Sequence, residues 1–199
     1  FAGADDVTLE SLEITGGRYG ILAAENAGSD NVTILNSRIY SNLYEEVVIS
    51  AGNDAWVIDG SEIFDTGGSP YDGLYIQNGN TRIENSSIHD VKHGINVAST
   101  GVVIRGNSLF DNSESGVEVS TISSVSLMIE NNQIFGNKLG INTRSSSSVT
   151  GQIVGNEVYE NTTDGIVTSS SVHVTGNHVH DNMGRGIFAG RLAIIEDNI

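Results

Sequence analysis

The chain has 199 residues, of which 38% are apolar, with 24 glycines, one proline and no cysteine. The absence of cysteine excludes a disulfide framework and a thiolate metal site. A net charge of -16, with only nine Lys and Arg, makes nucleic acid and anionic membrane surfaces poor partners. No apolar run approaches the ~18 residues of a transmembrane helix, so we expect no membrane insertion.

Pairs of apolar residues five positions apart recur from one end of the chain to the other. The pairs are Leu9/Ile14, Ile34/Ile39, Ile58/Ile63, Ile83/Ile88, Ile104/Leu109, Ile129/Ile134, Ile153/Val158, Val174/Val179 and Ile194/Ile199. Successive pairs begin 20 to 25 residues apart, and most are followed by a glycine and an apolar residue. A period of this length with short alternating runs is typical of a solenoid. The density of Gly and Asn disfavours helices, and leucine is too scarce for leucine-rich repeats. We therefore predict an all-β chain, with residues 1–199 forming one solenoid domain of eight to nine coils.

Equivalent positions of stacked coils form ladders. The sequence predicts an aromatic ladder of Tyr40, Phe64, His89, Phe110, Phe135, Tyr159 and His180. It predicts an asparagine ladder of Asn42, Asn112, Asn137, Asn161 and Asn182. A second polar ladder comprises Ser37, Ser61, Ser86, Asn107, Asn132, Asn156 and Asn177. Stacked polar side chains of this kind can satisfy the backbone groups of turns.

The unit from Ile129 to Thr143 resembles the repeat of right-handed parallel β-helix proteins. Ile129 and Ile134 are followed by Phe135 and Asn137, and Gly140-Ile141 then opens another short run. The resemblance covers essentially the whole chain and implies the architecture of pectate lyases, polysaccharide lyases and mannuronan C5-epimerases. It implies a secreted, extracellular or cell-surface module that binds or acts on an acidic polysaccharide such as alginate or pectate, as a lyase or epimerase.

The catalytic motif of the epimerases is not carried over. That family has a Tyr-Gly-Phe-Asp-Pro-His-Glu type of run, whereas this chain has Tyr71-Asp72-Gly73-Leu74-Tyr75-Ile76-Gln77. Tyr75 and Gln77 stand where the family has Asp and His. The 25 acidic residues make calcium the most compatible cofactor, although neither the RTX nonapeptide nor a pectate-lyase calcium pattern is recognisable. We therefore name no metal ligands.

The run after each glycine step is expected to offer a long outward face to a linear polymer. The outward positions are Leu22, Val48, Tyr75, Asn96, Glu118, Asn142, Val167 and Phe188. An insertion in the third coil, Gly67-Gly68-Ser69-Pro70, delivers Tyr71 and Asp72 beside this face, and inserted loops are common sites of function.

Abstraction of a sugar-ring proton needs a base, an acid and a cation that neutralises the uronate carboxylate. We assign these catalytic roles to His93, Tyr75 and Lys92, with Arg82 as an alternative cation. The predicted substrate-binding residues are Tyr71, Asp72, Gln77, Arg82, Asn96, Glu118, Lys138, Asn142 and Arg144.

Two alternatives remain at this stage. The chain could be a structural or adhesive rod, such as a segment of a surface protein or tailspike, or a binding portion of an enzyme whose active coils lie elsewhere. His178 and His180 would point the same way on a strand and so suit a metal, but the place of His180 in the aromatic ladder favours ring stacking. We expect the chain to be part of a longer rod, and exposed solenoid ends could associate end to end.

Overall fold

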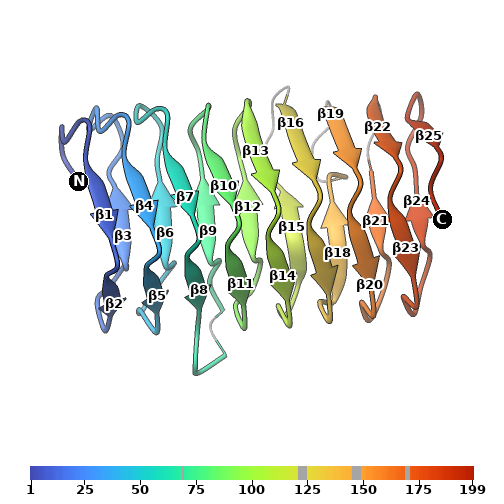
Figure 1. The fold of residues 1–199 in the computed structure, drawn as a ribbon, viewed down its shortest axis with the longest axis horizontal. Coiled ribbons are helices and arrows are strands. Elements are labelled where there is room, and N and C mark those ends of the chain that lie inside the picture. The colour runs from blue at the N-terminus through green and yellow to red at the C-terminus, as the bar shows by residue number, and fades with distance from the viewer. Residues whose placement is uncertain (69, 121–124, 145–148, 169–170) are drawn as a thin grey trace.

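The computed structural model describes residues 1–68, 70–120, 125–144, 149–168 and 171–199, and these form 25 strands in three parallel sheets. Each coil contributes one strand to each sheet, so strands β1–β3 make the first coil and β22–β24 the eighth, with β25 following. The coils stack into a rod with the two termini at opposite ends (Figure 1). The prediction of an all-β parallel β-helix of eight to nine coils is confirmed.

Sheet A contains β1 (Thr8–Glu10), β4 (Thr33–Leu35), β7 (Val57–Asp59), β10 (Arg82–Glu84), β13 (Val102–Arg105), β16 (Val125–Glu130), β19 (Val149–Val154), β22 (Val172–Thr175) and β25 (Ile194–Glu196). Sheet B contains β2 (Glu13–Thr15), β5 (Arg38–Tyr40), β8 (Glu62–Phe64), β11 (Ser87–His89), β14 (Ser108–Phe110), β17 (Gln133–Phe135), β20 (Glu157–Tyr159) and β23 (His178–His180). Sheet C contains β3 (Ile21–Ala23), β6 (Val47–Ile49), β9 (Leu74–Ile76), β12 (Ile95–Val97), β15 (Ser115–Val119), β18 (Leu139–Asn142), β21 (Ile166–Val167) and β24 (Ile187–Phe188).

The core is a set of aliphatic ladders that runs along the rod. In sheet A, Ile34 pairs with Ile58, Ile58 with Ile83, and Ile83 with Ile104, and all four are fully buried. Because side chains alternate between the two faces of a strand, one apolar residue in the middle of a three-residue strand suffices to fill the interior. The five-residue spacing of the sequence places one such residue in sheet A and the next in sheet B.

A two-residue corner joins each sheet A strand to the sheet B strand that follows. Its first residue has a left-handed backbone, as at Asn36 (φ 49°) and Gly60 (φ 60°), where Asn and Gly carry the smallest penalty. Its second residue belongs to the predicted Ser/Asn ladder. The Asn107 backbone N–H donates to Asn132 Oδ1 (2.9 Å), and Asn132 N–H donates to Asn156 Oδ1 (3.0 Å). The ladder therefore satisfies buried backbone groups at a corner where no sheet can do so.

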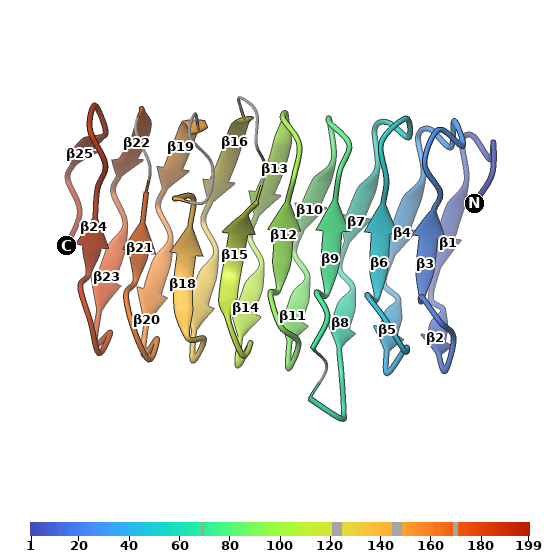
Figure 2. The same ribbon diagram turned by 180° about the vertical axis from the view of Figure 1, so that it is seen from behind.

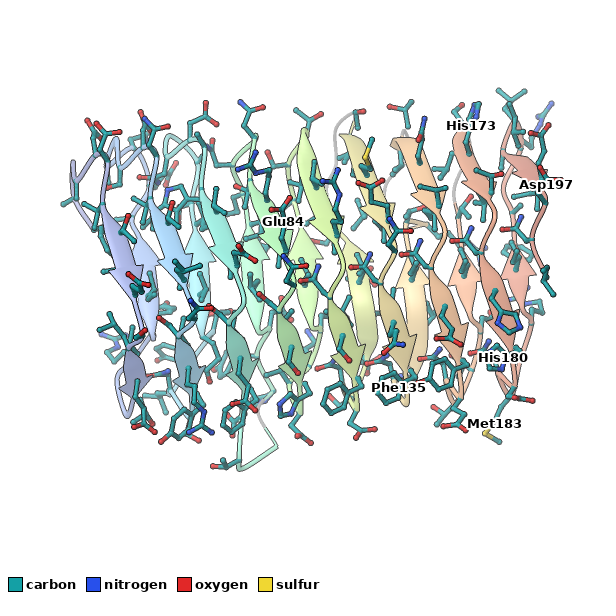
Figure 3. All side chains as sticks on the ribbon, in the orientation of Figure 1. Glu84, Phe135, His173, His180, Met183 and Asp197 are labelled. Carbon is teal, nitrogen blue, oxygen red and sulfur yellow. The ribbon has the colours of Figure 1, made fainter. Side chains whose placement is uncertain are left out.

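The aromatic ladder also forms as predicted. Neighbouring rings are stacked nearly parallel, from Tyr40 on Phe64 (4.8 Å between centroids, 8°) to Tyr159 on His180 (5.2 Å, 1°). Figure 3 shows Phe135 and His180 in this row along one edge of the rod. The two ladder histidines, His89 and His180, thus take the place of other aromatic rings.

The glycine that precedes most sheet C strands is required by the close approach of the next coil. A Cβ atom at Gly165 would lie 2.7 Å from the Gly186 carbonyl oxygen and 2.8 Å from Val179 Cγ1. In the second coil Glu46 takes this position and is 1% exposed, and its carboxylate accepts hydrogen bonds from the Asn42 backbone and side-chain amides. Burial raises the pKa of the Glu46 carboxyl, although the Asn42 hydrogen bonds oppose the shift.

The inserted loop of the third coil lies between β8 and β9 and projects beyond the other turns (Figure 1). Ser69 in this loop lies outside the described residues. No helix in the described part of the chain is long and apolar enough to cross a bilayer.

Candidate functional site

Sheet C carries the predicted outward row. The strand register pairs Tyr75 with Asn96, Asn96 with Glu118, and Glu118 with Asn142, so these side chains stand side by side across four successive coils. Figure 2 shows the strands of sheet C as one face of the rod. The alternation in the sequence therefore identified the outward positions of this sheet.

The turn that leads into each sheet C strand adds a second row at the edge of this face. The Gly73 N–H donates to the His93 carbonyl (2.9 Å), and the Gly94 N–H donates to the Ser115 carbonyl (2.9 Å). Asp72, His93 and Ser115 therefore occupy equivalent places in the third, fourth and fifth coils. We call Asp72, His93, Asn96, Ser115 and Glu118 the central cluster.

Asp72 is a buried carboxylate, 7% exposed, at one side of the central cluster. Its Oδ2 accepts a hydrogen bond from Asn96 Nδ2 (2.7 Å), and Asn96 Oδ1 in turn accepts one from the Ser120 hydroxyl (2.5 Å). The other carboxylate oxygen of Asp72, Oδ1, is also buried and has no hydrogen-bond partner among the described residues. Such an oxygen calls for an explanation in function or in a bound water or ion, because burial of an acceptor without a partner is costly.

Glu118 is the second buried carboxylate, also 7% exposed. It accepts hydrogen bonds from the Ser115 hydroxyl (3.1 Å) and from Asn142 Nδ2, which lies 3.0 and 3.2 Å from its two oxygens. Each carboxylate of the cluster is thus held by the asparagine of the next coil, Asp72 by Asn96 and Glu118 by Asn142. Hydrogen bonds from neighbouring side chains therefore fix the orientation of both acids.

His93 lies between the two carboxylates in the coil order. Burial lowers its pKa below the usual value; the charges of Asp72 and Glu118 oppose this shift and that of Lys92 adds to it. The imidazole is therefore neutral at neutral pH. Its Nδ1 lies 3.3 Å from the Ser115 backbone nitrogen and accepts that N–H, so the ring proton belongs on Nε2.

Charged and aromatic side chains surround the cluster. Lys138 forms an ion pair with Glu114 (2.8 Å), and its hydrogen bond lowers the pKa of the Glu114 carboxyl. Lys92 is half-buried beside His93. Tyr71 packs edge-on against the ring of Tyr44 at 5.1 Å.

The predicted site residues on either side of the cluster keep to the same face. Gln77 Nε2 donates to the Tyr75 hydroxyl (3.2 Å). The Arg144 backbone N–H donates to Asn142 Oδ1 (3.1 Å), and its guanidinium lies 5.4 Å from the centre of the Phe188 ring. All predicted site residues except Arg82 therefore belong to sheet C or to its adjoining turns.

Arg82 is the exception. It lies on β10 in sheet A, where Arg82 pairs with Val57 and Val103, and its side chain is exposed on that sheet. The structure does not bring it to Tyr75, because the chain leaves sheet C after β9 and turns before β10 begins. Closeness in sequence is thus no guide to closeness in space at this point of the coil.

The sequence did not single out a hollow further along sheet C. Its volume is about 370 Å³, and it is lined by Leu139, Asn142, Arg144, Asp164, Val167 and Arg185. Arg185 pairs with Asp164 through two contacts of 2.6 and 3.2 Å, and its guanidinium lies 4.0 Å from the centre of the Phe188 ring. The hollow extends the polar face beyond the predicted groove.

Among the described residues, three potential metal-ligating side chains approach one another only at Glu157, His178 and His180, which lie in sheet B. The histidine and carboxylates of the central cluster do not form such a group in the described chain. Binding of calcium therefore stays a prediction.

Three parallel sheets that surround one aliphatic core define a parallel β-helix. Sheet C gives it a long outward face. The chain belongs to the right-handed β-helix family, whose model, described as a right handed beta helix region, matches residues 1–127 and 72–199. None of the curated proteins matches the sequence.

Among solved structures, the chain is similar to the catalytic unit of a thermostable GH87 alpha-1,3-glucanase from Streptomyces thermodiastaticus strain HF3-3. The superposition has a TM-score of 0.57 at 10% identity and covers 98% of this chain and 49% of the glucanase chain. This chain thus spans about half the length of that enzyme unit, and the likeness shows the fold.

Proposed function

We propose that the protein is a carbohydrate-active β-helix that binds a polysaccharide along sheet C and cleaves its glycosidic bonds at the central cluster. The observation that carries this proposal is the pair of buried, oriented carboxylates, Asp72 and Glu118, on one outward face with a neutral histidine between them. Glycoside hydrolysis commonly uses two carboxyl groups, one as a general acid and the other as a base or nucleophile.

The spacing between the coils bears on which catalytic roles the two carboxyl groups would take. Asp72 and Glu118 lie in the third and fifth coils, and coils stack at strand spacing, so the acids are separated by roughly 9–10 Å along the rod. This spacing along the rod is by itself well above the ~5.5 Å between the carboxyl groups of retaining enzymes, and it lies at the limit of the about 6.5–9.5 Å of inverting ones. Asp72 and Glu118 would therefore act as an acid and a base with a water molecule between them, and inversion is the expected stereochemistry.

His93 suits the role of a hydrogen-bond donor better than that of a base. Since Nδ1 accepts the Ser115 N–H, the Nε2–H of the neutral ring is the group left to meet a substrate hydroxyl. Tyr75, Asn96 and Asn142 line the same row and supply further polar contacts for sugar hydroxyls.

The charge of the cluster favours a neutral glycan. Asp72, Glu118 and Glu114 are three acids, opposed by Lys92 and Lys138, and Lys138 is already paired with Glu114. A polyuronate carboxylate would meet net repulsion here as long as both Asp72 and Glu118 are ionised, and would add charge beside whichever carboxylate serves as the base. The solved β-helix of similar fold is named an alpha-1,3-glucanase, and this supports trying α-1,3-glucan first. Action on such a polymer would place the protein outside the cell or at its surface.

A second candidate is a lyase or epimerase that acts on an acidic polysaccharide. Lys92 beside His93, and Arg144 further along the same face, favour it because they could neutralise a uronate carboxylate, and bound calcium could assist them. This mechanism needs a base, and His93 could serve only after its proton moved to Nδ1 and the Ser115 N–H found another acceptor. The geometry therefore supports the hydrolase better.

The test is an incubation of the protein with α-1,3-glucan, other neutral glucans, alginate and pectate, with and without calcium. Hydrolysis releases reducing ends without new ultraviolet absorbance, whereas a lyase produces unsaturated ends that absorb, and an epimerase changes the C5 configuration seen by proton NMR. We expect reducing ends from a neutral glucan, lost in Asp72→Asn and Glu118→Gln and retained in Arg82→Ala, the control on sheet A. Ultraviolet-absorbing ends from a polyuronate would favour the second candidate. Inactivity and no binding on every polymer, with an intact circular dichroism spectrum, would leave the structural rod.

A further inference from the structure

A histidine pair and a glutamate meet on sheet B, at a distance from the central cluster. Strands β20 and β23 are parallel neighbours, and their register pairs Glu157 with His178 and Tyr159 with His180. His178 and His180 are two residues apart on one strand, so their side chains point to the same face. Glu157 on the preceding coil points to that face as well.

The three side chains approach one another closely enough to share an ion. Glu157 Oε1 lies 3.9 Å from His178 Nδ1 and 3.8 Å from His180 Nε2, and one ligand atom from each residue falls within 4.8 Å of the others. Tetrahedral Zn²⁺ with bonds of about 2.0–2.1 Å separates its ligand atoms by roughly 3.4 Å. The side chains of His178 and Glu157 are 53% and 41% exposed, so their rotation toward the more buried His180 can close the remaining gap.

His180 is already arranged as a metal ligand. Asp181 Oδ2 lies 2.9 Å from His180 Nδ1, and a hydrogen bond there keeps a proton on Nδ1, so that the neutral ring has its lone pair on Nε2. The same hydrogen bond raises the pKa of His180, so a metal ion would have to displace a proton from Nε2 at low pH. That Nε2 atom is buried and has no hydrogen-bond partner among the described residues. A carboxylate that holds the far nitrogen of a ligating histidine is the usual outer partner in metal sites. The stack of His180 on Tyr159 fixes the plane of the ring.

The same ladder contains an internal comparison at His89. His89 Nδ1 contacts Asp90 (2.7 Å), and His89 Nε2 faces Glu62 (3.5 Å), as His180 faces Asp181 and Glu157. The residue that pairs with Glu62 there is Ser87, where the later coil has His178. Ring stacking and an adjacent acid therefore account for His89. His178 lies outside the ladder, and its ring contacts that of His180 at 4.2 Å between centroids, which brings the two imidazoles together beside Glu157.

We propose that Glu157, His178 and His180 bind a divalent transition-metal ion, best suited to Zn²⁺, with Asp181 as the outer partner of His180. Two imidazoles and one carboxylate are ligand types that suit Zn²⁺. Three protein ligands leave a fourth position for water, and the half-exposed side chains of His178 and Glu157 open that position to solvent, while His180 Nε2 is buried. The site is independent of the polysaccharide face, because it lies on a different sheet.

The test is calorimetric titration of the tag-free protein with zinc chloride. We expect one ion per chain, and a Kd that rises at least about tenfold in His178→Ala and in His180→Phe. Phenylalanine keeps the stacked ring, as Phe110 and Phe135 do elsewhere in the ladder, and removes only the ligand. Asp181→Asn should weaken binding by about tenfold, the usual effect of losing an outer partner.

The matched control is His89→Phe, which should leave the Kd unchanged within about twofold. Visible absorption of the Co²⁺-loaded protein gives a second readout, because a four-coordinate site absorbs far more strongly than hydrated Co²⁺. Absence of saturable zinc binding by the wild type would overturn the proposal. So would wild-type affinity in His178→Ala, or an equal loss in His89→Phe, since both would show non-specific binding to surface acids and histidines.

Discussion

Replacement of Asn137 by alanine should be among the most damaging single changes in the rod. Asn137 is fully buried at the corner between sheets B and C. Its Nδ2 donates to the carbonyls of Leu109 (3.0 Å) and Phe135 (3.0 Å) and to Asn161 Oδ1 (3.1 Å), and its Oδ1 accepts from the backbone N–H (3.1 Å) and side-chain amide (2.9 Å) of Asn112.

The size of the effect follows from which groups lose their partners. The Asn112 backbone N–H is buried and would have no acceptor after the change, and the Asn112 amide would keep only a long contact of 3.4 Å to the Ile88 carbonyl. A buried polar group without a partner costs about 1–3 kcal/mol. Two such groups indicate a loss of about 2–6 kcal/mol in the free energy of unfolding.

The assay is urea unfolding followed by circular dichroism. Gln152→Ala is the control, because Gln152 is exposed on β19 and its replacement should change stability by less than about 0.5 kcal/mol. If Asn137→Ala unfolds at the same urea concentration as this control, the asparagine ladder does not stabilise the coils, and the account of the corners fails.

Three further changes test other features. Gly165→Ala should destabilise the rod by about 1–3 kcal/mol in urea unfolding, since the new Cβ would lie 2.7 Å from the Gly186 carbonyl; an unchanged midpoint would contradict the close approach of the coils. Burial raises the pKa of Glu46 in the folded state. The free energy of unfolding of the wild type, measured against that of Glu46→Gly, should therefore be greatest at acidic pH and fall as the pH rises through that pKa. A wild-type-minus-variant difference that does not change with pH would refute this. By NMR, His93 should titrate below its usual pKa of 6.5, and lower still in Asp72→Asn, because the Asp72 charge raises the pKa that burial lowers; an upward shift in the variant would be inconsistent with the cluster.

The sequence was a good guide to the fold because each ladder repeats one type of side chain at one offset. The five-residue spacing places Ile129 near the end of β16 in sheet A and Ile134 in the middle of β17 in sheet B, with both side chains in the core. Asn137 follows at the corner, where its amide replaces sheet hydrogen bonds. A repeated local requirement is readable without the structure, because every coil must meet it.

The candidate site was less predictable because it depends on how different coils come together. The alternation correctly placed Asn96 and Glu118 in the outward row. The burial of Asp72 could not be predicted from the sequence, because Asp72 is in the turn of one coil and is covered by Asn96 of the next coil, which donates a hydrogen bond to it. Arg82 was grouped with Tyr75 through closeness in sequence, although the chain changes sheets between them.

The far end of the face was missed for a related reason. Val167 and Phe188 make the outward row apolar there, so the row gave no sign of a polar site. Asp164 and Arg185 immediately precede the glycine steps of successive coils, so the repeat aligns them. The hollow that they line is seen only in the structure.

The most direct test of the polysaccharide site is the release of reducing ends from α-1,3-glucan by the wild type and by the Asp72→Asn/Glu118→Gln double variant. The account predicts measurable release by the wild type and loss of at least about a hundredfold in the double variant, at unchanged circular dichroism, as expected when acid–base groups are removed. Equal release by the two proteins would contradict the assignment of the carboxylates. No release from this or any other polysaccharide by the wild type would contradict the enzymatic function itself.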